Sequence, residues 1–289
     1  MNRITRILIK PNTFNIYKYQ KNQNPYIDIQ HQVTLNKVME QHNNLEKSLS
    51  SKITYKIDNI QHNLPDIVFV ANGGLCIPKI TNTVILPYMK YNQRQEELEY
   101  LKKIFKKINL DTIDFPGSDL APFEGQAELK WFHNGTKAIC GYGHRSTQET
   151  FHIIEDLFNK LFKQHNLTPP KLLVLPLESP DYYHLDVAML EFDDEKCIVH
   201  KKAFSNASVN MMKRFLGEEN VIVIDTPDSM CLNAIVDCKS LITHKITDSN
   251  IKSSLEQITN RKIIEIDTTE FEKSGGSVRC MTLDLFRKK

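Results

Sequence analysis

Apolar residues recur with helical spacing in five stretches of the chain. In the third of them, Phe151, Ile154 and Phe158 fall on one face, as expected for an amphipathic helix that packs against a core. We therefore predict helices at residues 33–49, 94–108, 148–165, 209–216 and 251–258.

Short runs rich in β-branched and aromatic residues lie between these stretches, and turn residues bound them, as is typical of strands. The predicted strands are residues 67–71, 83–88, 129–132, 138–142, 172–177, 187–192, 197–200, 221–224, 234–236, 240–243, 263–266 and 278–285. Residues 133–135 and 193–195 have the composition of hairpin turns.

The predicted helices are spaced at roughly 40 to 60 residues, a period typical of repeated supersecondary units. Each unit contains two or three strands and one helix, and no Pro-, Gly- or Ser-rich linker separates the units. The pattern favours the α/β class, with residues 1–289 forming a single closed domain of approximate fivefold symmetry. An ordinary mixed α+β domain is the alternative.

The composition is that of a folded protein with a sizeable core, because 40% of the residues are hydrophobic and 25% are charged. The 37 basic and 35 acidic residues leave a net charge of +2. A chain so nearly neutral has no general attraction for nucleic acid or anionic lipid, so we expect neither as a partner. A small-molecule substrate is expected, and an oligomer is allowed.

The N-terminal sequence MNRITRILIK has an apolar run too short for a signal peptide or a membrane span, which predicts a cytoplasmic protein. Six cysteines are dispersed along the chain, and five lie in apolar stretches, as buried cysteines of a reducing compartment do. No pair has the CxxC spacing of a zinc or redox site, so we expect no metal and no cofactor.

Cys280 differs from the other cysteines in its setting, because it follows the turn Gly275, Gly276, Ser277 and adjoins Arg279. Glycines let the backbone approach a ligand, and a neighbouring cation favours the thiolate needed for nucleophilic attack. A structural cysteine in an apolar strand is the alternative interpretation.

His184 and Asp186 would share one face of a strand by alternation, which places a proton shuttle beside a carboxylate. Glu124 directly precedes Gly125 ahead of a strand, where a carboxylate can accept two hydrogen bonds from a guanidinium. Each residue is also compatible with a plain structural or surface role. A cysteine and a histidine far apart in sequence are nevertheless what a thiol enzyme requires.

Short motifs along nearly the whole chain resemble the guanidine-modifying superfamily of the pentein fold. This superfamily includes arginine deiminases, dimethylarginine hydrolases, glycine amidinotransferases and arginine dihydrolases. The matching segments, in order, are IKPNTFNIYKYQKNQNPYI, PDIVFVANGGLCI, the arginine and glutamates of NQRQEELEYL, FEGQAELKW, ICGYGHRST, YYHLDVAML, CLNAIV and FEKSGGSVRCMTLDL.

The resemblance implies a fivefold α/β propeller with its active site in the central channel. It implies that Cys280 is the catalytic nucleophile, that His184 is the general acid and base, and that Glu124 and Asp186 hold the substrate guanidinium. Three further residues resemble substrate-binding positions of the family. They are Arg94 and Arg145, which resemble arginines that grip the α-carboxylate, and Asn24, in a loop at the substrate mouth.

Two motifs depart from the usual pattern of the superfamily. Asn72 stands where most relatives have aspartate, and asparagine there resembles the arginine dihydrolase branch. The EGxGD motif becomes EGQAE, with Ala127 and Glu128 in place of glycine and aspartate. The second change lengthens a carboxylate and stiffens a turn, which bears on activity and on substrate placement.

These observations predict a cysteine-dependent hydrolase of the guanidino group of arginine or a close derivative, without metal or cofactor. Thiolate attack would give a covalent thiouronium, which water then releases. Because Asn72 offers both a donor and an acceptor to a neutral ureido group, we expect a second hydrolysis to ornithine.

The sequence is also compatible with three alternatives. One is a different enzyme of the same chemistry: a dimethylarginine hydrolase, an arginine deiminase or an amidinotransferase. The second is a non-enzymatic propeller such as a ribosome-binding factor, since fold does not fix function. The third is an inactive descendant that binds arginine.

Overall fold

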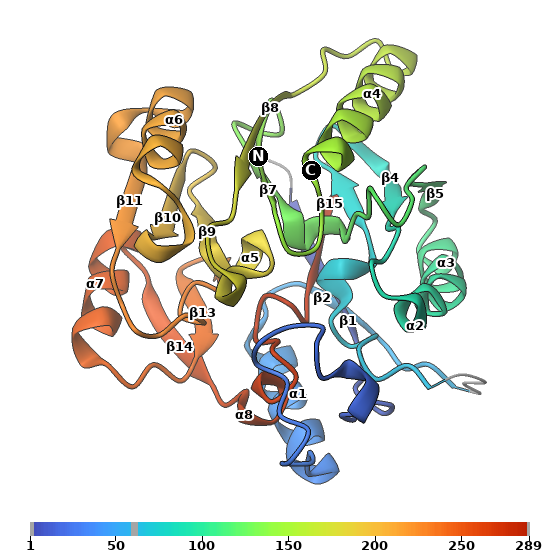
Figure 1. Ribbon diagram of the computed structural model, residues 1–289, viewed down its shortest axis with the longest axis vertical. Helices are drawn as coiled ribbons and strands as arrows, with labels where there is room; N and C mark the ends of the chain where they lie inside the picture. Colours follow the sequence, from blue (N-terminus) through green and yellow to red (C-terminus); the bar gives the residue numbers. More distant parts are fainter. Residues whose placement is uncertain (1–2, 59–62, 288–289) are drawn as a thin grey trace.

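A unit made of a two-stranded hairpin, a helix and a third strand occurs five times (Figure 1). The computed structural model describes residues 3–58 and 63–287. Four units are continuous in sequence. The first unit contains β3 (Leu75–Ile77), β4 (Ile80–Leu86), α3 (Glu97–Lys107) and β5 (Asp111–Asp114), and the second contains β6 (Leu129–Phe132), β7 (Lys137–Tyr142), α4 (Gln148–Gln164) and β8 (Lys171–Pro176). The third contains β9 (Met189–Phe192), β10 (Lys196–His200), α6 (Asn206–Leu216) and β11 (Val221–Ile224). The fourth contains β12 (Ile235–Asp237), β13 (Ser240–His244), α7 (Ser249–Thr259) and β14 (Lys262–Ile266).

The fifth unit is assembled from both ends of the described chain. Strand β15 (Leu283–Arg287) pairs antiparallel with β1 (Arg3–Ile9), and α1 (Leu35–Ser48) leads from β1 to its parallel neighbour β2 (Lys52–Tyr55). The unit therefore has the same strand order as the other four, with the two ends of the described chain in place of the hairpin turn, and it closes the ring. The prediction of a fivefold α/β propeller is confirmed.

The order of strands explains where the helices lie. In every sheet the middle strand is antiparallel to its hairpin partner and parallel to the third strand. A parallel pair needs a crossover connection, which the helix supplies. Figure 1 shows α1, α3, α4, α6 and α7 around the outside of the molecule, so the hairpins are left to face the centre.

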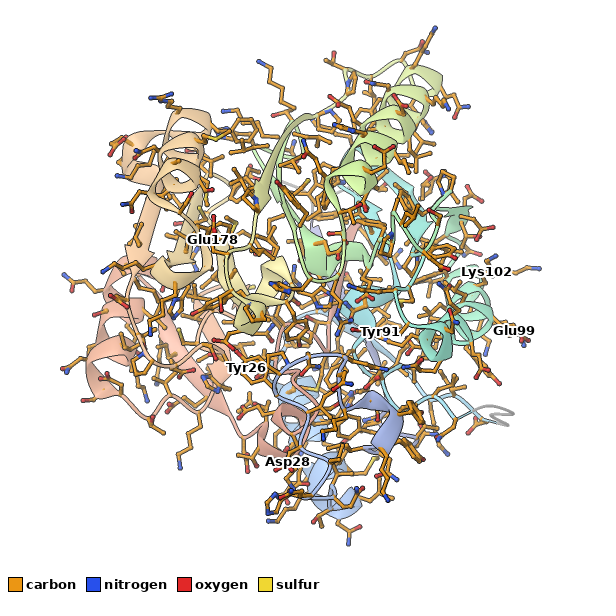
Figure 2. The ribbon with its side chains drawn as sticks, in the orientation of Figure 1. Tyr26, Asp28, Tyr91, Glu99, Lys102 and Glu178 are labelled. Carbon is orange, nitrogen blue, oxygen red and sulfur yellow. The ribbon has the colours of Figure 1, made fainter. Side chains whose placement is uncertain are left out.

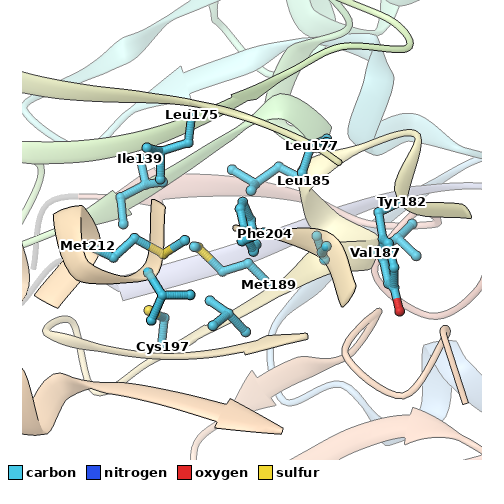
Figure 3. Packing of buried hydrophobic residues seen from close by; sticks show 14 of the residues in the cluster. Ile139, Leu175, Leu177, Tyr182, Leu185, Val187, Met189, Cys197, Phe204 and Met212 are labelled. Atoms are coloured by element: carbon cyan, nitrogen blue, oxygen red, sulfur yellow. The ribbon is translucent and has the colours of Figure 1, made fainter. Parts of the chain in front are cut away.

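Hydrophobic clusters fill the spaces between neighbouring units. In one of them, Leu175 and Leu177 from the second unit meet Met189, Cys197 and Met212 from the third (Figure 3). All five are buried. Burying a leucine or methionine side chain contributes roughly 1.5 to 3 kcal/mol, so these seams hold the units in a fixed relation to one another.

Both predicted hairpin turns are confirmed. His133, Asn134 and Gly135 have positive φ angles of 50°, 53° and 74°, and Asp193 and Asp194 have 52° and 64°. This left-handed region suits asparagine, aspartate and glycine, and it gives the twist that a tight hairpin needs.

Four predicted elements were wrong in extent or type. Residues 67–71 form turns that lead into the 3-10 helix η2 (Val70–Gly73), and residues 94–108 divide into α2 (Asn92–Gln95) and α3. The predicted strand at 187–192 begins with helix α5 (Leu185–Ala188), and the one at 278–285 begins only at Leu283. Periodicity alone cannot separate a short buried strand from other buried backbone.

Four strands were missed, namely β1, β2, β3 and β5. Strand β5, for example, has the sequence DTID and lies at the edge of its sheet, where polar side chains face water. In the part of the chain that the structure describes, no helix combines the length and the apolar character needed to cross a membrane.

Candidate active site

Four segments that carry predicted residues converge on the centre of the ring, and each precedes the first strand of its unit. Asn72 precedes β3, Glu124 precedes β6, His184 and Asp186 precede β9, and Cys280 precedes β15. Because the units are related by approximate symmetry, residues distant in sequence reach equivalent places around one axis.

Cys280 lies in the turn before β15 and is buried, with 4% of its surface exposed. Its Sγ is 3.5 Å from Oδ2 of Asp186 and 3.1 Å from Nδ2 of Asn233. Burial, together with the negative charge of Asp186, raises the pKa of the Cys280 thiol. Without a bound cation the thiol form is therefore favoured.

The prediction that the neighbouring Arg279 favours the thiolate of Cys280 is wrong. Its guanidinium points away from Cys280 and bonds to Glu191 (2.9 Å) and to Asp284 (3.1 Å). Adjacent residues in an irregular turn can face opposite ways, so sequence proximity does not bring this cation to the sulfur.

His184 is the residue at the N-cap of α5, and its backbone is extended there. The predicted strand alternation is therefore not what relates it to Asp186, which lies in the first turn of α5. Nε2 of His184 is 2.8 Å from Oε2 of Glu124 and 3.4 Å from Nδ2 of Asn72. Burial lowers the pKa of His184, with the hydrogen bond to Glu124 opposing that shift. A neutral imidazole is the form ready to accept a proton.

Glu124 is held ionised by two basic partners. Burial opposes ionisation, but Arg145, 2.8 Å from Oε2, and His184 keep the pKa of Glu124 well below its usual range. The Arg145 guanidinium lies between the rings of Tyr91 and Tyr183, with its central carbon 4.9 and 5.1 Å from the two centroids. It also donates to the carbonyl oxygen of Gln23 at 2.9 Å.

Arg94 is engaged by protein groups on several sides. Its Nε and Nη2 donate to Glu97 at 2.8 and 2.9 Å, and its Nη1 donates to Oδ1 of Asn72 at 3.0 Å. Burial raises the pKa of Glu97 to about 7 although Arg94 counteracts it. A substrate carboxylate at Arg94 would have to share the guanidinium with these groups.

The altered EGQAE motif places a carboxyl group behind Glu124. Glu128 is buried, and its Oε2 accepts a hydrogen bond from the backbone nitrogen of Glu124 at 3.1 Å. Burial and the nearby charge of Glu124 raise the pKa of Glu128 far above its usual range. Glu128 thus supports the turn that carries Glu124, and burial disfavours a second charge there.

A cavity of about 20 Å³ is bordered by six of the eight predicted residues, and Glu124 and Asp186 are not among its lining residues. Its walls include Asn24, Asn72, Arg94, Arg145, His184 and Cys280. Asn24 donates to the carbonyl oxygen of Ser274 at 3.1 Å and so ties the N-terminal segment to the turn before Cys280. Tyr26, in the same segment, is labelled just below the middle of the molecule in Figure 2, and its hydroxyl bonds to the carbonyl oxygen of Asp181 at 2.9 Å.

A larger cavity of about 420 Å³ is lined by the hairpin ends and by Arg6, Glu191, Arg279 and Asp284. Neither Cys280 nor His184 borders it. Within residues 3–58 and 63–287, no three His, Cys, Asp or Glu side chains are grouped to hold a metal ion.

Asn233 is a site residue that the sequence prediction missed, although the segment CLNAIV was noted for its resemblance. It is fully buried and contacts Cys280 directly. Its place immediately before strand β12 is the signal that would have found it, because the other candidate residues precede the first strands of their units.

Comparison with known proteins identifies the family and the fold. The family model for eukaryotic N,N dimethylarginine dimethylhydrolase matches residues 3–287. The chain belongs to this family. Among relatives, the bifunctional arginine dihydrolase/ornithine cyclodeaminase AgrE of Nostoc is 26% identical over 88% of the chain and 34% of its own length. The N(G),N(G)-dimethylarginine dimethylaminohydrolase of Mycobacterium tuberculosis is 24% identical over 98% of the chain and 86% of its length.

Among solved structures, the fold is shared with the N-terminal domain of ArgZ, an arginine dihydrolase from cyanobacteria, solved as a Cys-to-Ser variant bound to substrate. The TM-score is 0.82 at 22% identity, with 99% of both chains covered. The present chain spans about a third of the length of the bifunctional enzymes it matches.

Proposed function

We propose that this protein is a hydrolase of C–N bonds in the guanidino group of arginine or a close derivative, with Cys280 as the nucleophile. The observation that carries the proposal is the incompletely hydrogen-bonded carboxylate of Asp186 beside the Cys280 sulfur. Its Oδ1 is buried and has no hydrogen-bond partner in the described residues, while Oδ2 lies 3.5 Å from the Cys280 sulfur. A buried carboxylate calls for a cation, and a guanidinium there would present its central carbon to the sulfur.

The catalytic steps follow from the protonation states of the side chains. Cys280 gives its proton to the neutral His184, and Glu124 stabilises the imidazolium that results. The thiolate attacks the guanidino carbon, and His184 passes the proton to the departing nitrogen, so that ammonia leaves and an S-alkylthiouronium remains. Water then attacks, gives a proton to His184, and restores the thiol as citrulline forms.

Asn72 favours a second hydrolysis, which makes arginine dihydrolase the reaction we propose. In that cycle the neutral ureido group of citrulline loses ammonia to give a thiocarbamate, and water releases a carbamate that separates into ornithine and carbon dioxide. The ureido oxygen needs a hydrogen-bond donor, which the amide of Asn72 offers and a carboxylate does not. Dimethylarginine hydrolase, deiminase and amidinotransferase are the related activities that the experiment must separate.

Substrate entry requires movement, because a cavity of about 20 Å³ holds little more than one water molecule. Gln23, Asn24 and Ile27 form one wall of it. We propose that this N-terminal segment moves outward to admit the substrate, and that residues 1–289 work as one guanidine-modifying domain.

Product analysis tests the proposed function. The native protein and Cys280→Ser are incubated with arginine, with dimethylarginine, and with arginine plus an amine acceptor, and the products are separated by chromatography. We expect ornithine from arginine with the native protein and no turnover with Cys280→Ser, while calorimetry shows arginine binding to both. Equal turnover in the two proteins would remove Cys280 from the mechanism, and binding without turnover in the native protein would identify an inactive arginine-binding protein.

A further inference from the structure

The fourth unit also contributes a polar side chain, that of Asn233, to the centre of the ring, and the proposed catalytic steps do not use it. Asn233 precedes β12 as Cys280 precedes β15. It is fully buried between the apolar residues Leu232 and Ala234. A buried amide without a structural or chemical use is costly, so its contacts indicate its purpose.

The oxygen of the Asn233 side chain fixes the turn that carries the sulfur. Oδ1 lies 3.0 Å from the backbone nitrogen of Arg279 and 3.3 Å from that of Cys280, and both nitrogens donate. Only the amide oxygen can accept two hydrogen bonds, so the orientation of the amide is decided by chemistry. Nδ2 therefore faces the other way.

The nitrogen of the same amide has two hydrogens and two acceptors. It donates to the backbone oxygen of Asp186 at 3.2 Å and to Sγ of Cys280 at 3.1 Å. All four hydrogen bonds of the Asn233 side chain are therefore made with the two segments that carry the nucleophile and the cation-binding carboxylate.

We propose that Asn233 is a catalytic residue, which stabilises the Cys280 thiolate through its amide N–H and holds the sulfur beside Asp186 through its amide oxygen. This role rests on the proposed function in so far as Cys280 is the nucleophile. A hydrogen bond donated to sulfur is stronger when the sulfur is charged, so it favours the thiolate.

Asn233 and Asp186 act on the sulfur in opposite directions. The carboxylate repels a thiolate and accepts the S–H, which raises the pKa of Cys280, whereas the amide of Asn233 lowers it. A guanidinium bound to Asp186 neutralises the opposing charge. The hydrogen bond from Asn233 then continues to favour the charged sulfur, and the thiolate forms when substrate is present.

Alkylation of Cys280 by iodoacetamide between pH 6 and pH 10 tests this role without any assumption about substrate. Labelling is followed peptide by peptide with mass spectrometry, and Cys238, which is exposed, is the reference in the same tube. Asn233→Asp keeps an oxygen for the two backbone donors but removes the amide hydrogens, and Asn233→Ala removes both functions.

We expect Cys280 in both variants to be labelled at least tenfold more slowly at pH 8, with its apparent pKa shifted upward and Cys238 unchanged. Labelling of the buried Cys140 reports unfolding, so a variant in which Cys140 reacts as fast as Cys238 is set aside in favour of the other. A native rate and a native pH profile for Cys280 in either folded variant would overturn the role of Asn233.

Turnover separates the failure of this inference from the failure of the proposed function. If arginine is hydrolysed, kcat in Asn233→Asp should fall at least fiftyfold while KM changes less than threefold. If the native protein hydrolyses nothing but alkylation still depends on Asn233, the proposed function fails and the control of the thiol stands. Unchanged kcat together with unchanged alkylation sinks the inference alone.

Discussion

The Cys280 thiol donates a hydrogen bond to Oδ2 of Asp186 at 3.5 Å, so the candidate nucleophile and the candidate substrate anchor are in direct contact. In the absence of a cation this contact holds the sulfur in its protonated form. Binding of a guanidinium and activation of the thiol are therefore coupled through one carboxylate.

Asp186→Asn should make the thiol more reactive and the enzyme less active. Two charges about 4 Å apart interact by roughly 4 kcal/mol at an effective dielectric constant near 20. Removing the carboxylate charge lowers the pKa of Cys280, and we expect alkylation at pH 8 to quicken by about tenfold or more. Arginine turnover should fall at the same time because the cation loses its anchor. Alkylation no faster than in the native protein would show that Asp186 does not control the sulfur.

Asn72→Asp should change the product rather than the first step. The carboxylate still faces a guanidinium well but repels a ureido oxygen, so citrulline should accumulate and ornithine should fall at least tenfold. Time courses of both products measure this, with the exposed Asn250→Asp as the matched control. If the variant still releases ornithine at the native ratio, Asn72 is not the reason for a second cycle.

Arg145→Lys tests whether Arg145 is needed for its shape as well as its charge. Lysine cannot lie flat between Tyr91 and Tyr183 or keep two directed hydrogen bonds to Glu124 and Gln23. We expect a loss of about 2 kcal/mol in the free energy of unfolding, measured by urea titration.

The control for that substitution is Arg214→Lys on the exposed face of α6, which should change the stability by less than about 0.5 kcal/mol. Arg145→Lys should also lower turnover, because Glu124 and its contact with His184 lose their support. Native stability in Arg145→Lys would mean that a point charge suffices at this position.

His244 should make the stability depend on pH. It bonds to Asp228 (3.0 Å) and Glu272 (3.2 Å), and these hydrogen bonds raise the pKa of His244 to about 9 in spite of burial. Because the folded pKa exceeds the unfolded value near 6.5, the stabilisation is complete below about pH 6.5 and is lost as the pH rises through about 9. Its size is up to about 3 kcal/mol.

Urea unfolding of the native protein and of His244→Gln at pH 6.0 and pH 9.5 measures this contribution. The native protein should lose more stability than the variant between the two pH values, and other titrating groups cancel in the comparison. An equal loss of stability in the two proteins would show that the charged imidazole of His244 does not stabilise the fold.

Local periodicity was enough to place the five long helices and most of the strands. Residues 148–165 show why, since their apolar face at Phe151, Ile154 and Phe158 is the face that α4 buries. Polar edge strands such as β5 were missed because a strand with little burial has no apolar signal. The break between α2 and α3 was missed because contacts with the rest of the molecule decide where such a helix divides, and local periodicity does not contain them.

The chain by itself determined which residue types are available for thiol chemistry and that the strands and helices recur in repeated units. Only the tertiary structure decided which of them meet. It turned Arg279 away from Cys280, brought Asn233 to the sulfur, and put His184 on Glu124 rather than on a strand face with Asp186. The reason is physical: the directions of side chains in short turns depend on packing between units that are distant in sequence, and no local pattern encodes that packing.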